Sequence, residues 1–239
     1  MNDSNVKNIV ILGGGTAGWM TASLLQKKWQ HLGIKITVVE SPDIGIIGVG
    51  EGSTPLLKVF FDSLEISESE WMPACNATYK NGISFNDWST VSGYESYFHP
   101  FPCSLDFATF GLLYKYSALR RKGLDLLAHP NRFSLMAGLT EKKLAPIPSE
   151  NFPFHFQYGY HFDSVLIGNF LRRRAKEIGV EHIEATVQDV EQNSNGDIKS
   201  LKLNNEQTLP GDFFIDCSGF ASVLLQKTLK VPFLNFAEN

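Results

Sequence analysis

The sequence has few charged residues and few cysteines, and both scarcities narrow the range of functions. Charged residues make up 19% of the 239 positions, with 21 Lys and Arg against 25 Asp and Glu, for a net charge of −4. Without a basic excess, neither nucleic acid nor an anionic membrane is an expected partner. Cysteine occurs three times, at Cys75, Cys103 and Cys217, with no Cys-x-x-Cys pair. This pattern argues against a disulfide framework and against a zinc or other metal site, and it favours a reducing compartment.

Long apolar segments are also missing. No N-terminal run is long enough for a signal peptide, and no segment approaches the roughly 20 apolar residues that cross a bilayer. We therefore expect a cytoplasmic protein without membrane attachment. Apolar residues nevertheless make up 43% of the chain, which is sufficient to build the core of one large domain.

The start of the chain has the pattern of a strand, a turn, a helix and a second strand. Residues 7–12 (KNIVIL) and 35–40 (KITVVE) are apolar, β-branched runs typical of buried parallel strands. Three glycines follow the first run, and residues 17–30 predict a helix with a wide apolar face. This order within about 35 residues predicts a βαβ unit and an α/β fold.

Regular patterns return after residue 160. Asp163 and Ser164 can cap a helix that runs to about residue 178, where Gly179 ends it. The remaining predicted elements are a hairpin of strands 183–191 and 198–203 around a turn at 193–197, a buried strand at 213–216, and a helix at 221–229. Between residues 41 and 160 the pattern is irregular, with helices expected only at 56–64 and 107–123.

This irregular segment is interpreted as an insertion into one α/β unit. We expect residues 1–55 and 160–239 to form a cofactor-binding core, and residues 56–159 to carry the active site and the substrate. Aromatic residues reach 12% of the chain and gather between Tyr79 and Tyr116. Such rings either build an ordinary core or line pockets for flat ligands. His99 and Phe101 are candidate substrate-pocket residues.

The turn after the first strand has the dinucleotide-binding spacing Gly13-x-Gly15-x-x-Gly18. The first glycine permits a tight turn, the second lets the backbone approach a pyrophosphate, and the third lets the helix pack close to the strand. The phosphates then meet N–H groups at the helix start, at Thr16 and Ala17. Glu40 lies 22 residues after Gly18, where a carboxylate can accept hydrogen bonds from ribose hydroxyls. An acid at this position favours FAD or NAD over NADP.

Five segments together resemble the flavin-dependent, tryptophan-type halogenase family. They are GGGTAGWM at 13–20, GVGEGSTP at 48–55, the block from Glu70-Trp71-Met72 to Trp88, YHFD at 160–163 and FIDCSG at 214–219. The resemblance covers essentially the whole chain. It implies the FAD/NAD(P)-binding, Rossmann-like α/β fold of the flavin monooxygenase-like superfamily, with an aromatic-rich insertion.

The resemblance also implies roles for individual residues. The segment Gly48, Val49, Gly50 and Glu51 would form a strap along the flavin, and the backbone of Val187 would face the adenine. Lys80 falls on the position of the family's catalytic lysine. That lysine engages hypohalous acid, by a hydrogen bond or as a haloamine, and delivers an electrophilic halogen to an aromatic carbon. A compact ammonium, or a free amine when partly desolvated, suits this chemistry.

The implied reaction is halogenation of an electron-rich aromatic compound, such as an indole, pyrrole or phenol. It uses oxygen, a halide ion and reduced FAD that a separate flavin reductase supplies. Many tryptophan halogenases have Ala-Thr where this chain has Gly52-Ser53, which leaves free tryptophan unassigned as the substrate. Regiochemistry, the choice of chloride or bromide, and the oligomeric state, including a homodimer, stay open.

Family members are longer than this chain, and their Trp-x-Trp-x-Ile-Pro block, catalytic glutamate and halide site are absent from it. We therefore expect the N-terminal part of a longer protein, or a natural truncation. Two alternatives remain at this point. One is an FAD-dependent aromatic monooxygenase that uses NAD(P)H directly, and the other is a non-catalytic FAD-binding fragment.

Overall fold

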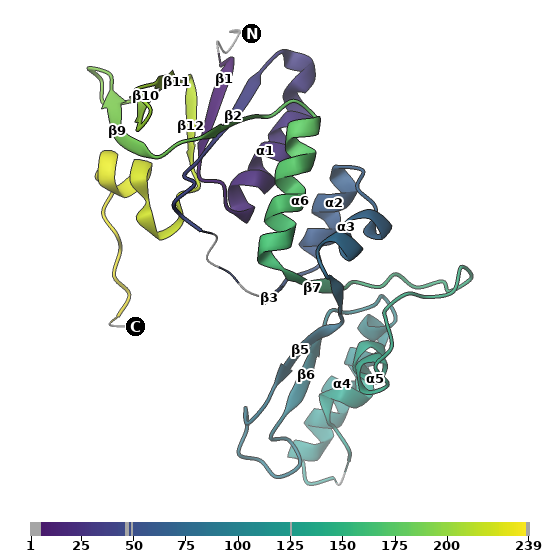
Figure 1. Ribbon diagram of the computed structural model, residues 1–239. Coiled ribbons are helices and arrows are strands. Elements are labelled where there is room, and N and C mark those ends of the chain that lie inside the picture. The colour runs from purple at the N-terminus through teal and green to yellow at the C-terminus, as the bar shows by residue number, and fades with distance from the viewer. Residues whose placement is uncertain (1–5, 46–47, 49, 125, 238–239) are drawn as a thin grey trace, which may run out of the picture. The chain divides into compact units, whose positions relative to one another are not determined.

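The computed structural model describes residues 6–45, 48, 50–124 and 126–237, and the chain divides into two compact units (Figure 1). Unit 1 consists of residues 1–49 and 163–239, and unit 2 of residues 50–162. These boundaries lie near the expected limits at 56 and 159. The assignment of the cofactor to one part and of the substrate to the other stays a prediction.

A four-stranded parallel sheet forms the centre of unit 1. Its strand order is β12 (Phe213–Asp216), β1 (Asn8–Leu12), β2 (Lys35–Glu40), β8 (Glu181–Glu184). The helix α1 (Thr16–Trp29) connects β1 to β2, and the short 3-10 helix η1 (Gln30–Leu32) follows it. Residues Ile9, Val10 and Ile11 of β1 are at most 2% exposed because this strand is covered on both faces. That burial explains the continuous apolar run, and the parallel α/β sheet predicted from it is confirmed.

Two layers cover this sheet. On one side, α1 packs against α6 (Ser164–Glu177), as the purple and green helices of Figure 1 show. On the other side lies an antiparallel meander of β9 (Val187–Gln192), β10 (Ile198–Leu203) and β11 (Thr208–Pro210). Val10, Leu12 and Val39 of the sheet share one core cluster with Leu201 and Leu203 of β10. Successive side chains of a strand point to opposite faces, so Ile9 and Ile11 turn toward the α1 layer.

Two of the predicted elements in unit 1 need correction. The expected strand 183–191 is two strands: β8 pairs with β2, and β9 starts the meander after a break at Ala185 and Thr186. The backbone N–H of Ala185 donates to the Glu40 carbonyl, and that of Thr186 donates to the Asn204 side chain, so the chain changes sheets there. The expected α-helix 221–229 is a 3-10 turn η3 (Gly219–Ala221) followed by a π-helix η4 (Val223–Thr228).

The start of α6 confirms its predicted cap. The Asp163 carboxylate accepts hydrogen bonds from the backbone N–H groups of Val165 and Leu166, both at 2.9 Å. Gly179 follows the helix with φ of +102°, a conformation that glycine adopts without strain. The hairpin turn at 193–197 is also present, closed by the Asn193 N–H donating to the Asp197 carbonyl.

Unit 2 contains more regular structure than its sequence indicates. Helices were expected at 56–64 and 107–123, and the structure has α2 (Leu56–Ser63) and α4 (Asp106–Arg121) there. The additional elements are β3 (Gly50–Gly52), α3 (Glu68–Ala74), β4 (Thr78–Lys80), β5 (Gly82–Phe85), β6 (Tyr97–Pro100), η2 (Pro130–Phe133), α5 (Leu135–Glu141) and β7 (Gly159–Asp163). Strands this short carry too little periodicity for recognition from sequence. They form the sheets β3-β7-β4 and β5-β6.

The core of unit 2 is aromatic. Trp71, Phe61 and Tyr160 are at most 1% exposed. The Phe61 and Trp71 rings stack with centroids 4.2 Å apart, and Trp71 meets Tyr160 edge-on at 4.7 Å. These contacts fix α2 and α3 against β7. None of the helices described here has the length and apolarity that a membrane crossing would require.

Candidate functional site

The glycine turn of unit 1 has the geometry of a phosphate cradle. Gly13 has φ of +120°, and a Cβ there would lie 2.2 Å from the Cys217 carbonyl oxygen. A Cβ on Gly18 would lie 1.9 Å from the Gly13 carbonyl oxygen, so α1 can pack this close to the turn only if residue 18 has no side chain. At Gly15, by contrast, a Cβ would have no described atom within 4 Å. Two glycines are therefore required by packing, and the third borders open space where a ligand can approach.

The start of α1 is suited to an anion. Gly15 is the N-cap residue and has no side chain to bond the first N–H groups, and no acidic residue lies in the first turn. Thr16 and Ala17 are the first two residues of this 14-residue helix. Backbone N–H groups at a helix start, together with the helix dipole, favour a negative ligand.

Glu40 lies beside this turn. Its side chain covers Gly14, where a Cβ would lie 2.2 Å from the Glu40 Cδ. The carboxylate Oε2 contacts His182 Nε2 at 3.0 Å and Arg172 Nη1 at 3.8 Å. Among the described residues, both of these ion-pair contacts use Oε2. His182 in turn meets Trp19 of α1 edge-on, with ring centroids 5.0 Å apart.

The other predicted cofactor residues are spread over both units. Gly48 lies in unit 1 and is partly buried, whereas Gly50 and Glu51 are exposed in β3 of unit 2. Val49 lies outside the described residues. Val187 begins β9 and pairs with Leu203 of β10. No described residues form a cluster of three or more His, Cys, Asp or Glu suited to a metal ion.

The chain at the end of β12 packs against the glycine turn. The Cys217 N–H donates to the Leu12 carbonyl at 2.8 Å, which places its own carbonyl under Gly13. The preceding Asp216 accepts from the backbone N–H groups of Leu224 at 2.8 Å and Leu225 at 2.9 Å through Oδ2. Burial pushes the pKa of Asp216 upward, but the hydrogen bonds from Ser218, Leu224 and Leu225 outweigh it and lower the pKa overall. A charged Asp216 therefore caps the π-helix.

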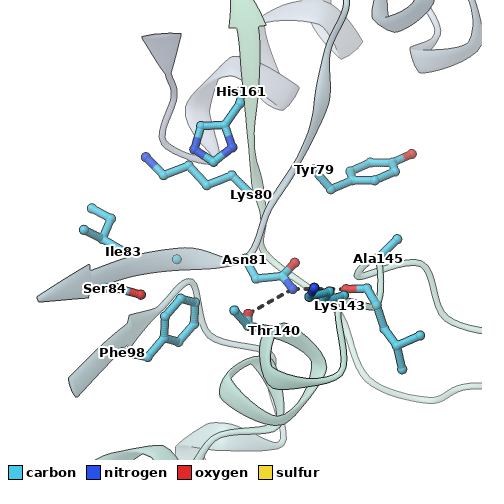
Figure 2. A pocket seen from close by; sticks show the side chains of 12 residues that line it. Tyr79, Lys80, Asn81, Ile83, Ser84, Phe98, Thr140, Lys143, Ala145 and His161 are labelled. Atoms are coloured by element: carbon cyan, nitrogen blue, oxygen red, sulfur yellow. Dashed lines mark hydrogen bonds between the residues drawn. The ribbon is translucent and has the colours of Figure 1, made fainter. Parts of the chain in front are cut away.

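Lys80 lies in unit 2 at the end of β4 and borders an open pocket of about 660 Å³ (Figure 2). The pocket walls come from β4, β5, β6, β7 and the end of α5. These walls combine apolar and polar side chains. The pocket lining includes Tyr79, Ile83, Phe98, Thr140, Leu144 and His161. Asn81 joins two of these walls, because its Nδ2 donates to Thr140 Oγ1 and to the Leu144 carbonyl, each at 3.2 Å. A pocket of this size admits a flat aromatic compound.

An aromatic ring lies near the Lys80 amine. The amine nitrogen lies 5.7 Å from the centroid of the Phe101 ring, one of the two predicted substrate residues. His99, the other, lies on β6 and is exposed, and its ring meets those of Phe85 and Tyr97. Phe98, next to His99 in sequence, contributes to the pocket wall instead. In the described part of the chain, no carboxylate forms an ion pair with Lys80.

Lys80 and His161 share one face of the β4–β7 ladder. In this antiparallel pair, Thr78 is opposite His161, Tyr79 opposite Tyr160 and Lys80 opposite Gly159. Figure 2 shows the Lys80 and His161 side chains on one side of the strands and Tyr79 on the other. Burial, and then the Lys80 charge, lower the pKa of His161, so its imidazole is neutral at pH 7.

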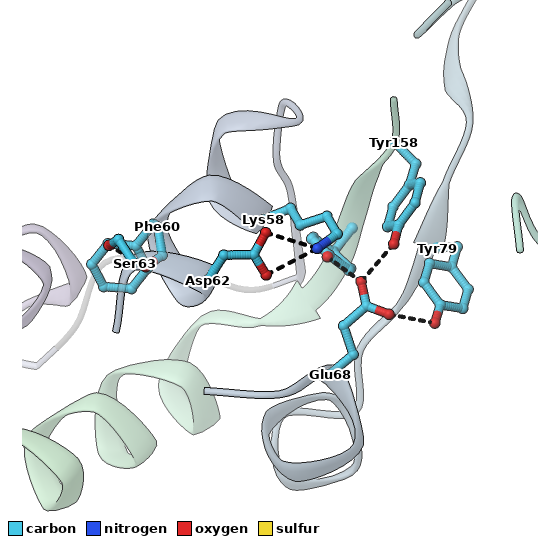
Figure 3. A network of polar contacts seen from close by, with 8 residues as sticks. Lys58, Phe60, Asp62, Ser63, Glu68, Tyr79 and Tyr158 are labelled. Atoms are coloured by element: carbon cyan, nitrogen blue, oxygen red, sulfur yellow. Dashed lines mark hydrogen bonds and ion pairs between the residues drawn. The ribbon is translucent and has the colours of Figure 1, made fainter. Parts of the chain in front are cut away.

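Glu68 organises the opposite face of the ladder (Figure 3). Its carboxylate accepts three phenol hydrogen bonds, from Tyr79 at 2.9 Å, Tyr158 at 2.8 Å and Tyr160 at 2.6 Å. Burial, and then the bond to Glu68, raise the pKa of Tyr79 to about 12. The same two causes raise the pKa of Tyr158 and Tyr160 further. All three phenols therefore stay protonated as donors at neutral pH.

No local sequence pattern indicates the Glu68 cluster, or Gly52 as a neighbour of Lys80. Glu68 is one acid in the acidic run ESE, and its partners are 11, 90 and 92 residues away. His161 lies within the segment YHFD, for which the family resemblance implies no catalytic role. For His161 beside Lys80 a signal does exist. Once Tyr79-Lys80 and Tyr160-His161 are paired as strands, period-two alternation places the two tyrosines on one face and Lys80 and His161 on the other.

Comparison with known proteins agrees with these features. A family model described as tryptophan halogenase matches residues 8–239. The tryptophan 6-halogenase of Streptomyces toxytricini is 33% identical over 100% of this chain and 49% of its own. The tryptophan 7-halogenase of Lentzea aerocolonigenes is 34% identical over 98% of this chain and 46% of its own. The chain thus spans about half the length of the curated relatives it matches.

Solved structures give the class of protein that has this fold. BrvH, a flavin-dependent halogenase from Brevundimonas sp. BAL3, superposes with a TM-score of 0.82 at 32% identity, covering 98% of this chain and 46% of its own. A flavin-dependent halogenase from Xanthomonas campestris superposes with a TM-score of 0.79 at 35% identity, covering 95% and 45%. The fold is therefore the Rossmann-like fold of flavin-dependent halogenases. Within that class, the chain belongs to the tryptophan halogenase family.

Proposed function

We propose that this chain is the part of a flavin-dependent halogenase that binds FAD and carries the catalytic lysine. The observation that carries the proposal is the position of Lys80. Its side chain borders the pocket of unit 2, and it lies in the block that resembles the family's lysine block. The substrate class is an electron-rich aromatic compound, such as an indole, because the pocket that Lys80 borders includes apolar and aromatic side chains such as Ile83 and Phe98.

The glycine turn fits the pyrophosphate of FAD. Backbone N–H groups at Gly15, Thr16 and Ala17 would hold it, with Gly13 and Gly18 shaping the turn. Glu40 would accept a ribose hydroxyl, the Val187 backbone would face the adenine, and the strap of Gly48, Gly50 and Glu51 would lie along the flavin. When bound, reduced FAD supplies the electrons with which oxygen and a halide ion yield hypohalous acid.

Lys80 would then transfer the halogen. As an ammonium it donates a hydrogen bond to the hypohalous acid and polarises the bond between oxygen and halogen. As a free amine it attacks the halogen, and hydroxide leaves with the amine proton as water, which gives a haloamine. In either form the halogen is electrophilic toward a ring carbon, and that carbon loses its proton afterwards. The neutral His161 adds no positive charge that would repel the ammonium.

The partners follow from this chemistry. A separate flavin reductase would supply reduced FAD by diffusion, and chloride or bromide would be the co-substrate. A homodimer and a cytoplasmic location stay predictions from the sequence. The main alternative, an aromatic monooxygenase, would accept electrons from NAD(P)H at its own flavin.

An FAD titration tests the cofactor site. We expect saturable quenching of flavin fluorescence by the purified chain and loss of that binding in Gly15→Asp. The new side chain has open space, so the melting temperature should stay unchanged while its carboxylate occupies the pyrophosphate position. Equal binding by Gly15→Asp, or no binding by the wild type, would contradict the proposal. Reduction of bound FAD by NADPH alone would favour the monooxygenase.

A further inference from the structure

We propose that Gly52 is a positioning residue for Lys80: its missing side chain and the imidazole of His161 together form a seat in which the lysine amine rests. The inference deepens the proposed function, because it concerns the same lysine. The seat can nevertheless be measured without turnover, so its failure and the failure of the halogenase assignment are distinguishable.

The first support is the distance from Gly52 to the amine. A Cβ built on Gly52 would lie 2.9 Å from Lys80 Nζ, 3.2 Å from His161 Cδ2 and 3.5 Å from His161 Nε2. Contacts below about 3.0 Å are sub-van der Waals for a methyl group, so an alanine here and the amine cannot both keep their places. The amine therefore lies closer to Gly52 than a side chain at position 52 would allow.

The second support is the architecture that brings these three residues together. They lie on the three strands of one sheet, in the order β3-β7-β4. The Ser53 backbone N–H donates to the Tyr160 carbonyl at 2.8 Å, and the Tyr160 N–H donates to Ser53 Oγ at 3.0 Å. This pairing holds Gly52 against β7 next to His161. On the other face, the Glu68 cluster fixes Tyr79 and Tyr160, the sequence neighbours of Lys80 and His161.

The third support is the charge around the seat. His161 has a lowered pKa, first through burial and then through the Lys80 charge, so a neutral ring forms the wall. The Phe101 ring lies 5.7 Å from the amine and also contributes no charge. Of the remaining charged groups, Glu51 is exposed on β3, and Lys143 borders the wider pocket. The two rings beside the amine, those of His161 and Phe101, are thus both uncharged.

We expect Gly52 to control the position of the Lys80 amine relative to the pocket. With Gly52, the amine lies back against β3 and the pocket in front of it remains open. With alanine at this position, the amine must move away from Gly52, and the pocket that Lys80 borders is the open space beside it. Gly52 therefore determines both the resting position of the lysine and the room left for the substrate.

A matched pair of glycine substitutions in one strand tests the seat. Gly52→Ala adds a methyl group against the amine, whereas Gly50→Ala adds one that meets no described atom within 4 Å. Each purified chain is treated with a limiting acetylating reagent at pH 7.5, and modification of Lys80 is followed over time by peptide mass spectrometry. Lys143 and Lys58, the latter paired with Asp62, serve as references within the same sample.

We expect Lys80 in Gly52→Ala to be acetylated severalfold faster than in the wild type, because the added methyl group displaces the flexible end of the lysine from its place beside Gly52. Lys80 in Gly50→Ala should react at the wild-type rate, and the reference lysines should not change. Equal Lys80 rates in all three chains would overturn the proposal, as would equal acceleration in both variants. These outcomes need no halogenation, so they do not depend on the proposed function.

A second variant keeps the test decisive if Gly52→Ala does not fold. His161→Ala removes the other wall of the seat and is expected to accelerate acetylation of Lys80 as well, with the melting temperature within a few degrees of the wild type. A wild-type Lys80 rate in folded His161→Ala would contradict the part of the proposal that assigns a wall to His161. In an active enzyme, Gly52→Ala should also change the ratio of halogenated regioisomers.

Discussion

Removal of the Glu68 carboxylate should destabilise unit 2 far more than removal of a surface acid. Glu68→Ala leaves three phenol donors without their acceptor, and two of them belong to the buried residues Tyr158 and Tyr160. An unsatisfied buried donor costs about 1–3 kcal/mol, so we expect a loss of about 3–5 kcal/mol in the free energy of unfolding. Asp62 provides the control. Its side chain is 58% exposed and pairs with Lys58, and its loss should cost about 0.5 kcal/mol.

Urea unfolding at pH 7, followed by tryptophan fluorescence and circular dichroism, measures both variants. Glu68→Gln adds a graded step, because one amide oxygen can still accept from Tyr158 and Tyr160 while the amide nitrogen faces Tyr79. Its expected loss is about 1–2 kcal/mol, the contribution of the missing charge. A loss in Glu68→Ala no greater than that in Asp62→Ala would refute the reasoning.

Two further predictions concern pH and the cap of the terminal helix. The pKa of Tyr79 is raised to about 12 in the folded chain, so the unfolded chain releases this proton first as pH rises. The stability that Tyr79 contributes is full below pH 10 and is lost between pH 10 and 12. Over that range, the urea midpoint should fall less steeply with pH in Tyr79→Phe than in the wild type, and identical slopes would contradict this. The lowered pKa of Asp216 gives the opposite pH dependence. The stability that the Asp216 carboxylate contributes is present above about pH 4 and is lost as pH falls below that value. Asp216→Asn places an amide N–H₂ or a single uncharged oxygen against the N–H groups of Leu224 and Leu225. It should lower the free energy of unfolding by about 1–3 kcal/mol, measured by thermal unfolding at pH 7. An unchanged melting temperature would contradict this.

The sequence was most informative where the pattern is long and local. The run KITVVE predicts β2 with its observed bounds, and the glycine spacing predicts a turn whose steric demands at Gly13 and Gly18 the structure makes explicit. The Asp163 cap could be predicted because its partners are two and three residues away. In each case the determining contacts lie within a few residues.

The parts that could not be predicted depend on contacts between distant segments. Strands β3, β4 and β7 have three to five residues each, and only their pairing in one sheet brings Gly52 and His161 to Lys80. The terminal π-helix has the composition of an α-helix, but Asp216 binds the N–H groups of Leu224 and Leu225 and selects a different start. The division of 183–191 into two strands likewise follows from a bond to the Glu40 carbonyl, 145 residues earlier in the chain than Ala185.

The most direct test of the halogenase assignment compares wild type with Lys80→Ala under turnover conditions. The purified chain is supplied with FAD, a flavin reductase, NADH, oxygen, bromide and indole, and products are identified by mass spectrometry while FAD binding is measured in parallel. We predict brominated indole from the wild type, and none from Lys80→Ala although it binds FAD equally well. Equal bromination by both proteins would contradict the role of Lys80, and no product from a wild type that binds FAD would identify a non-catalytic FAD-binding chain.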